Sequence, residues 1–223
     1  MRRMALIGSA VSVACAAPAL AGVVTVSDQN GQVGSYSQIA DAMAWIGSQG
    51  DPLTNYSVLA SSGGYLGFES VENSTLSWGN SPGVIEIDGT MRVRSTSSLT
   101  VEIGGLSNAL APFGGPVDYD TILCTGLVRI EGAINIQLVN GFVPVFGNTF
   151  EIIASGTDVQ LFSTATINGP ALGGGLSWQM YVGASTFGGP DFGAKSLFVT
   201  VVPAPGAIAL FGVAGIISRR GRR

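Results

Sequence analysis

Apolar and polar residues alternate with a period of two along the middle of the chain. The alternation runs through residues 85–94, returns in 99–103, and is seen again in 128–138. Side chains of a β-strand point to opposite faces in turn, so each segment predicts a strand with one buried face. The predicted buried positions are Ile85, Ile87, Met91, Val93, Leu99, Val101, Ile103, Val128, Ile130, Ile134, Ile136 and Leu138. Turns are predicted at Gly89, Gly104, Gly105 and Gly132.

One segment departs from this period. In Ser37–Gly47, apolar Ile39, Met43 and Ile46 follow a serine that is a candidate N-cap, and Gly47 closes the run. This spacing predicts one amphipathic helix of about three turns. Further strands are expected at Val23–Val26, Phe150–Ala154, Val159–Phe162, Leu176–Val182 and Leu197–Val202.

The composition favours an all-β fold. Glycine supplies 33 of 223 residues and only 11% of the chain is charged, which is typical of short strands joined by tight turns. The order of strand, helix and further strands resembles the start of right-handed parallel β-helix proteins, in which a helix covers the open end of the core. We therefore expect a short right-handed β-solenoid with one N-terminal capping helix and a sandwich-like cap at its end. An antiparallel β-sandwich is the alternative.

A second resemblance covers residues 118–154. This segment is similar to the closing coils of autotransporter passenger domains. The residues that carry the likeness are Asp118-Tyr119-Asp120, Gly126, Gly132, Leu138, Gly141-Phe142, Pro144, Gly147 and Phe150 to Ala154. The resemblance implies a β-helix in this part of the chain.

The first residues have the form of a secretory signal peptide. A basic start at Arg2 and Arg3 precedes the apolar run 5–17, which is too short for a stable membrane span. Small residues Ala19 and Ala21 before Gly22 predict Sec export and cleavage by signal peptidase after Ala21. The alternative is a lipobox at 12–15, with Cys15 lipidated.

The last residues resemble the PEP-CTERM family of sorting tails. Val202-Pro203-Ala204-Pro205 precedes the apolar segment 206–217, and a basic cluster follows it, made of Arg219, Arg220, Arg222 and Arg223. Arginines beside an apolar helix favour the cytoplasmic side of a membrane. Ala204 stands where the family has glutamate, and an ordinary C-terminal anchor is the alternative reading.

The resemblance implies a route for the protein. An exosortase, which is a membrane transpeptidase, would read the tail after a transient stop in the inner membrane. The protein would then reach the cell surface or the exterior of a Gram-negative type of cell. The expected organisation is a signal peptide (1–21), a β-rich extracellular domain (22–201) and a sorting tail with a hydrophobic helix (202–223).

Charge and residue usage exclude several function classes. Residues 22–202 hold four basic and 14 acidic residues, a net charge of −10, so nucleic acid is an implausible partner. The chain has no histidine, which removes Ser-His-Asp and Cys-His catalysis and argues against a zinc site. Cys124 is alone after the signal peptide and is expected to be a small buried residue. No cofactor or metal is expected.

Two carboxylate pairs are the candidates for chemistry. Glu86 with Asp88, and Asp118 with Asp120, would each project from one face of an extended segment. We expect Glu86 and Asp88 to pair across strands with Arg92 and Arg94, and Asp118-Tyr119-Asp120 to form a turn that enters a strand. No catalytic residue is therefore assigned.

The expected function is structural or adhesive, at the cell surface or in the extracellular matrix, in association with exopolysaccharide. Trp78, placed by its neighbours Gly79 and Pro82 in a loop, is the candidate for stacking on a sugar. A carbohydrate-active enzyme on a β-helix, either a polysaccharide lyase or a glycosidase, is the alternative.

Overall fold

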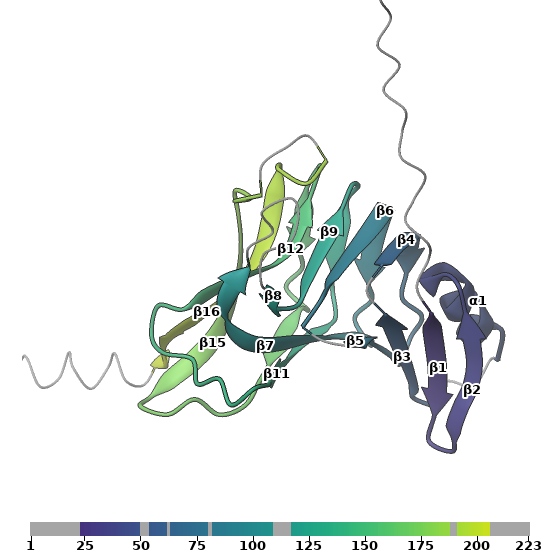
Figure 1. Ribbon diagram of the computed structural model, residues 1–223, viewed down its shortest axis with the longest axis horizontal. Coiled ribbons are helices and arrows are strands. Elements are labelled where there is room, and N and C mark those ends of the chain that lie inside the picture. The colour runs from purple at the N-terminus through teal and green to yellow at the C-terminus, as the bar shows by residue number, and fades with distance from the viewer. Residues whose placement is uncertain are drawn as a thin grey trace, which may run out of the picture.

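The computed structural model describes residues 23–49, 54–61, 63–79, 82–108, 117–187 and 191–205. Four sequence predictions lie outside these residues: the signal peptide 1–21 with its cleavage site at Gly22, Cys15, the hydrophobic helix of the tail, and the arginine cluster 219–223. The described residues form a strand-rich body with the N-terminal strands and helix at one end and the last strands at the other (Figure 1).

The described strands form two eight-stranded sheets. Sheet A contains β1 (Val24–Asp28), β2 (Gly31–Tyr36), β3 (Tyr56–Ser61), β5 (Ser74–Gly79), β7 (Ser98–Asn108), β8 (Val117–Tyr119), β11 (Ala133–Leu138) and β14 (Thr166–Asn168). Sheet B contains β4 (Gly63–Glu69), β6 (Val84–Val93), β9 (Thr121–Cys124), β10 (Val128–Ile130), β12 (Thr149–Ser155), β13 (Val159–Leu161), β15 (Leu176–Gly183) and β16 (Lys195–Pro203). The all-β class is therefore confirmed.

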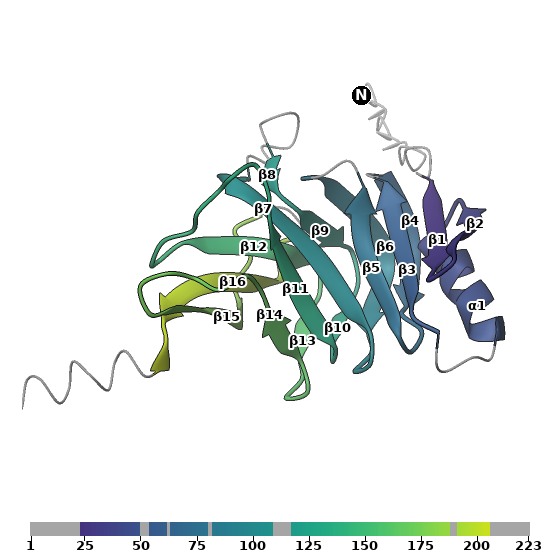
Figure 2. The ribbon, with the colours of Figure 1, turned by 90° about the horizontal axis from the view of Figure 1, so that it is seen from below.

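The chain moves back and forth between the two sheets. In sheet A, β3, β5, β7, β11 and β14 pair in parallel, and in sheet B β4, β6, β10 and β13 do the same. Pairing is antiparallel for β1 with β2 and β3, and for β16 with β12 and β15, at opposite ends of the body (Figure 2). Parallel pairing is one requirement of a β-solenoid, and the ends pair as a sandwich does. The right-handed solenoid stays a prediction.

Apolar side chains of neighbouring strands lie in register and form rows on the buried face of each sheet. Leu76 of β5 lies beside Leu99 of β7, and Leu99 lies beside Ile134 of β11. In sheet B, Met91, Val128 and Val159 form a similar row across β6, β10 and β13. All six are buried. Burial of each such side chain contributes on the order of 1.5–3 kcal/mol, so the alternation seen in the sequence builds the core.

The predicted helix is present as α1 (Ile39–Gln49). Its buried face includes Ile39, Met43 and Ile46, which join the same hydrophobic core as β1 and β3. The first acceptor of the helix is the carbonyl of Gln38, which takes a hydrogen bond from the N–H of Ala42, and the helix continues past Gly47. The predicted N-cap, Ser37, is therefore one residue too early, and the predicted end at Gly47 is two residues too early.

Several expected turns are strand residues instead. Gly89 lies inside β6, and both Gly104 and Gly105 lie inside β7, because these two strands are longer than the alternation predicted. Gly132 does lie between β10 and β11, as expected. The strands predicted at 150–154, 159–162, 176–182 and 197–202 are confirmed as β12, β13, β15 and β16.

Candidate functional site on the outer face of sheet B

A row of polar side chains crosses four neighbouring strands of sheet B. The register pairs Glu69 of β4 with Arg92 of β6, Arg92 with Arg129 of β10, and Arg129 with Gln160 of β13. We call these four residues the arginine row. Strands lie about 4.8 Å apart, so the row is about 14 Å long. Its members alternate with buried Met91, Val93, Val128 and Ile130, and therefore face outward.

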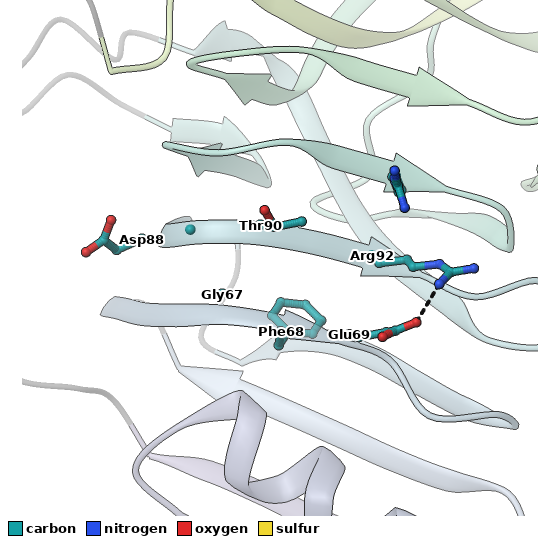
Figure 3. Close-up of a pocket in the computed structure, with 8 residues that line it drawn as sticks. Gly67, Phe68, Glu69, Asp88, Thr90 and Arg92 are labelled. Atoms are coloured by element: carbon teal, nitrogen blue, oxygen red, sulfur yellow. Dashed lines mark hydrogen bonds and ion pairs between the residues drawn. The ribbon is translucent and has the colours of Figure 1, made fainter.

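Arg92 pairs with two carboxylates. Its guanidinium donates to both carboxylate oxygens of Glu131, from Nε at 2.9 Å and from Nη2 at 3.0 Å. Its Nη1 donates to Oε1 of Glu69 at 2.7 Å (Figure 3), and Nε of Arg94 donates to the same oxygen at 2.8 Å. The hydrogen bond from Arg94, followed by the charges of both arginines, lowers the pKa of Glu69, and the bond to Glu131 raises the pKa of Arg92. These bonds fix the geometry of the row.

Arg129 differs from Arg92 in its partners. Its Nε donates to Oε1 of Gln160 at 3.2 Å. Within the described part of the chain no carboxylate lies at ion-pair distance from it. The Arg129 side chain is only partly buried, and a guanidinium has five N–H donors, so its charge and donors are accessible at the surface.

A hollow of about 440 Å³ lies beside the row. Its lining is Gly67, Phe68, Glu69, Asp88, Gly89, Thr90, Arg92 and Arg129. Asp88 and Arg92 lie at opposite ends of it, with Thr90 between them (Figure 3). A second hollow of about 420 Å³, between α1 and β4, shares Gly67, Phe68 and Glu69. Both signs of charge and several hydrogen-bonding groups therefore surround one shallow depression.

Glycines shape this depression. Gly89 has a φ of 121°, and the register between β4 and β6 shifts opposite it, at Leu66/Phe68. Such a bulge bends a strand. A Cβ on Gly126, in the bend between β9 and β10, would lie 2.5 Å from the carbonyl oxygen of Gly89. The backbone approach at this bend therefore requires glycine.

The predicted pairing of Glu86 and Asp88 with Arg92 and Arg94 is wrong. Because β6 continues through Gly89, Glu86, Asp88 and Arg92 lie on one strand and not on two facing strands. Asp88 instead accepts a hydrogen bond from the hydroxyl of Thr125 at 3.0 Å. Only Asp88 of this carboxylate pair lines the hollow.

Asp118 and Asp120 connect backbone segments. The carboxylate of Asp120, 1% exposed, accepts from the backbone N–H of Gly83 at 2.8 Å and from that of Glu102 at 2.7 Å. Gly83 precedes β6 and Glu102 lies in β7, so Asp120 ties the two sheets together. Asp118 accepts from the N–H of Ser107 at 3.0 Å. Neither carboxylate faces the hollow beside the row.

Trp78 is not a surface residue. It lies in β5, and its side chain is 3% exposed within the hydrophobic core. Its Nε1 has no hydrogen-bond partner among the described residues. The prediction of a loop position is wrong because Leu76 and Trp78 continue the period-two burial of a strand, so no face of this ring is free for a sugar.

Glu151 is a buried acid that sequence reasoning missed. Only 4% exposed, it accepts hydrogen bonds from the hydroxyls of Ser185, Thr186 and Ser196 and from the backbone N–H of Thr186. These bonds fix the segment after β15 against β12. The one signal in the sequence is an acid inside the apolar run 150–154.

Cys124 is buried, as predicted. Its thiol donates to the carbonyl of Gly89 at 3.0 Å. Burial, opposed by hydrogen bonds to the backbone, raises the pKa of the thiol to about 11. The side chain therefore contributes packing at the glycine bend and has little nucleophilic character.

The proline motif of the tail lies at the end of β16. Val202 and Pro203 pair with Ser177 and Leu176 of β15, and the N–H of Ala204 donates to the carbonyl of Gly175 at 2.7 Å. Val202, Pro203 and Ala204 are partly buried, and Pro205 is exposed. No helix in the described segments is long and apolar enough to cross a membrane.

No grouping of three or more acids and cysteines that could hold a metal occurs among the described residues. Compared with known proteins, the chain matches no family model and no curated protein.

Proposed function

We propose that the chain is an exported cell-surface or matrix protein with a structural or adhesive role, and that it binds exopolysaccharide through the arginine row. The observation that carries the proposal is the fixed row beside the hollow of about 440 Å³, with no carboxylate of the described residues at ion-pair distance from Arg129. Sugar hydroxyls both donate and accept hydrogen bonds, and the row offers carboxylate, amide and guanidinium groups to them.

Arg129 favours sugars that bear a carboxylate or a sulfate. A guanidinium presents donors in a planar fork that matches such groups, and charge-assisted bonds are about twice as strong as neutral ones. The net charge of −10 over residues 22–202 opposes an anionic polymer at long range. At physiological ionic strength this repulsion is screened beyond about 8 Å, so the groups in direct contact decide the binding.

An enzyme is the second candidate, and the site gives it less support. Glycoside cleavage needs two carboxyl groups on opposite sides of the scissile bond. Of the two predicted carboxylate pairs, one contributes only Asp88 to the hollow and the other serves backbone N–H groups. Glu69, the second acid at the hollow, is held by Arg92 and Arg94.

The route to the surface is the second part of the proposal. Signal peptidase would remove residues 1–21, the apolar segment 206–217 would stop in the inner membrane, and an exosortase would then process the tail. The sequence features at both ends support this route. Mass spectrometry of the protein recovered outside the cell tests it: loss of residues 1–21 and of the arginine cluster is the expected result.

Incubation of the exported protein with the exopolysaccharide of the producing cell tests the binding role. Co-sedimentation with a polymer of unchanged length is the expected result. Shortened chains or unsaturated products would instead establish the lyase or glycosidase alternative. A protein that stays in the supernatant at all polymer concentrations and leaves the polymer length unchanged would contradict both roles.

A further inference from the structure

A loop at the C-terminal end of the body exposes three large apolar side chains. The loop joins β11 to β12, and in it Val143, Val145 and Phe146 are 77%, 59% and 65% exposed. Scattered exposed apolar residues are ordinary, but three within four positions of one loop form a patch that water solvates poorly.

The loop has a fixed shape. Pro144 is buried between the exposed valines, and Phe142 packs edge-on against Phe150 with ring centroids 6.1 Å apart. The side-chain oxygen of Asn148 accepts a hydrogen bond from the N–H of Val145 at 2.8 Å. The backbone N–H of Asn148 donates to the carbonyl of Val145 at 3.1 Å. The apolar side chains are therefore held outward by their own turn.

This loop lies beside the end of β16, the last strand of the described residues. The N–H of Gly147 donates to the carbonyl of Val201, and the N–H of Val201 donates to the carbonyl of Asn148. Pro203 is two residues farther on, about 7 Å along the strand. In Figure 2 the yellow strand β16 ends on the same side of the body where β12 begins. The apolar segment 206–217 starts three residues after Pro203.

The surrounding chain carries no charge. No Asp, Glu, Lys or Arg occurs in residues 132–150, 159–190 or 196–218, although the chain has 24 such residues. These stretches supply the β11–β12 loop, the β14–β15 connection and the end of β16. Contact of these stretches with an apolar medium would therefore remove no charged side chain of theirs from water.

We infer that Val143, Val145 and Phe146 insert into the interface of a lipid bilayer while the segment 206–217 is held in the membrane. The inference rests on the proposed membrane stop of that segment and is independent of polysaccharide binding. As a helix, 12 residues would span about 18 Å, against a hydrocarbon core of about 30 Å. A short segment can stay inserted more readily when the body sits directly on the headgroups and adds apolar contacts of its own.

Two cysteine probes on the full chain test the inference in vesicles of phosphatidylethanolamine and phosphatidylglycerol. Val145→Cys carries an environment-sensitive fluorophore, and Leu66→Cys on β4, 57% exposed in the wild type, is the matched control. Both are made with Cys15→Ser, and Cys124 stays unlabelled because its buried thiol has a pKa raised to about 11. We expect a blue-shifted, several-fold brighter emission from position 145 and an unchanged one from position 66.

A second measurement is flotation of the unlabelled full chain with the same vesicles. Combined replacement of Val143, Val145 and Phe146 by serine should weaken partitioning about tenfold, and Leu66→Ser should leave it unchanged. If the chain floats while the probe at 145 and the serine variant show no effect, the inference is overturned and the membrane stop stands. If the chain does not float, both the loop insertion and the proposed membrane stop are contradicted, and the polysaccharide-binding proposal is unaffected.

Discussion

Arg92 and Glu131 form a two-point hydrogen-bonded ion pair, with Nε–Oε1 at 2.9 Å and Nη2–Oε2 at 3.0 Å. The pair neutralises the charge of Arg92. Its neighbour in register, Arg129, bonds to the neutral Gln160, and no carboxylate of the described segments pairs with it. One arginine of the row therefore has a structural role, and the other remains able to bind an anion.

Acid should remove the stability that Glu69 contributes. Its pKa in the folded protein is lowered from 4.5, first by the hydrogen bond from Arg94. A lowered carboxyl pKa gives stability that is present above the unfolded value and lost as the pH falls through the folded one. Urea unfolding of wild type and Glu69→Gln should therefore differ at pH 7, and the difference should shrink as the pH falls below 4.5 towards pH 3. An equal difference at both pH values would contradict the ion-pair account.

Asp120→Asn should destabilise the protein strongly. The substitution leaves the N–H groups of Gly83 and Glu102 sharing one carbonyl oxygen in place of two carboxylate oxygens. We expect the free energy of unfolding to fall by about 2–4 kcal/mol in urea titrations. Asp118→Asn, which affects one bond at a half-exposed site, is the control and should cost about 1 kcal/mol or less. Equal losses would refute the role of Asp120 as the link between the sheets.

Gly126→Ala should disturb the bend beside the hollow. The new Cβ would lie 2.5 Å from the carbonyl oxygen of Gly89, and backbone cannot move as a flexible side chain can. We expect a loss of about 1–3 kcal/mol in the free energy of unfolding. Gly173→Ala, where nothing lies within 4 Å, should stay within about 0.5 kcal/mol of wild type. A neutral Gly126→Ala would mean that the bend does not require glycine.

The thiol of Cys124 should resist modification in the folded protein. Burial raises its pKa to about 11, so very little thiolate is present at pH 8. Maleimide labelling followed by mass spectrometry should leave Cys124 unmodified in buffer and should modify it fully in concentrated urea. Rapid labelling without denaturant would show that the core around Gly89 opens.

The elements predicted correctly from the sequence are those whose apolar residues recur with one constant period. Alternation located β6, β7, β10 and β11, and helical spacing located α1. The signal for β5 was present as well, because Ser74, Leu76 and Trp78 alternate as buried residues, but Gly79 and Pro82 nearby favoured a loop. Tryptophan next to glycine and proline is ambiguous when only local residues are considered.

The candidate site depends on register, which local patterns do not contain. Arg92 and Arg129 are 37 residues apart, and they become neighbours only because Met91 pairs with Val128 in parallel strands. The burial of Glu151 likewise depends on Ser185 and Ser196, which lie 34 and 45 residues away. In contrast, the absence of histidine was readable at once and restricted the possible chemistry before any fold was known.

Replacement of Arg129 tests polysaccharide binding by the arginine row most directly. Exported Arg129→Gln and Lys195→Gln each lose one positive charge, and Lys195 lies on β16, outside the row. Titration with the exopolysaccharide of the producing cell, followed by sedimentation, gives the dissociation constant of each. We predict about a tenfold weakening for Arg129→Gln, as expected for one charge-assisted contact, and no change for Lys195→Gln. Equal dissociation constants for both variants and the wild type would contradict binding at the row.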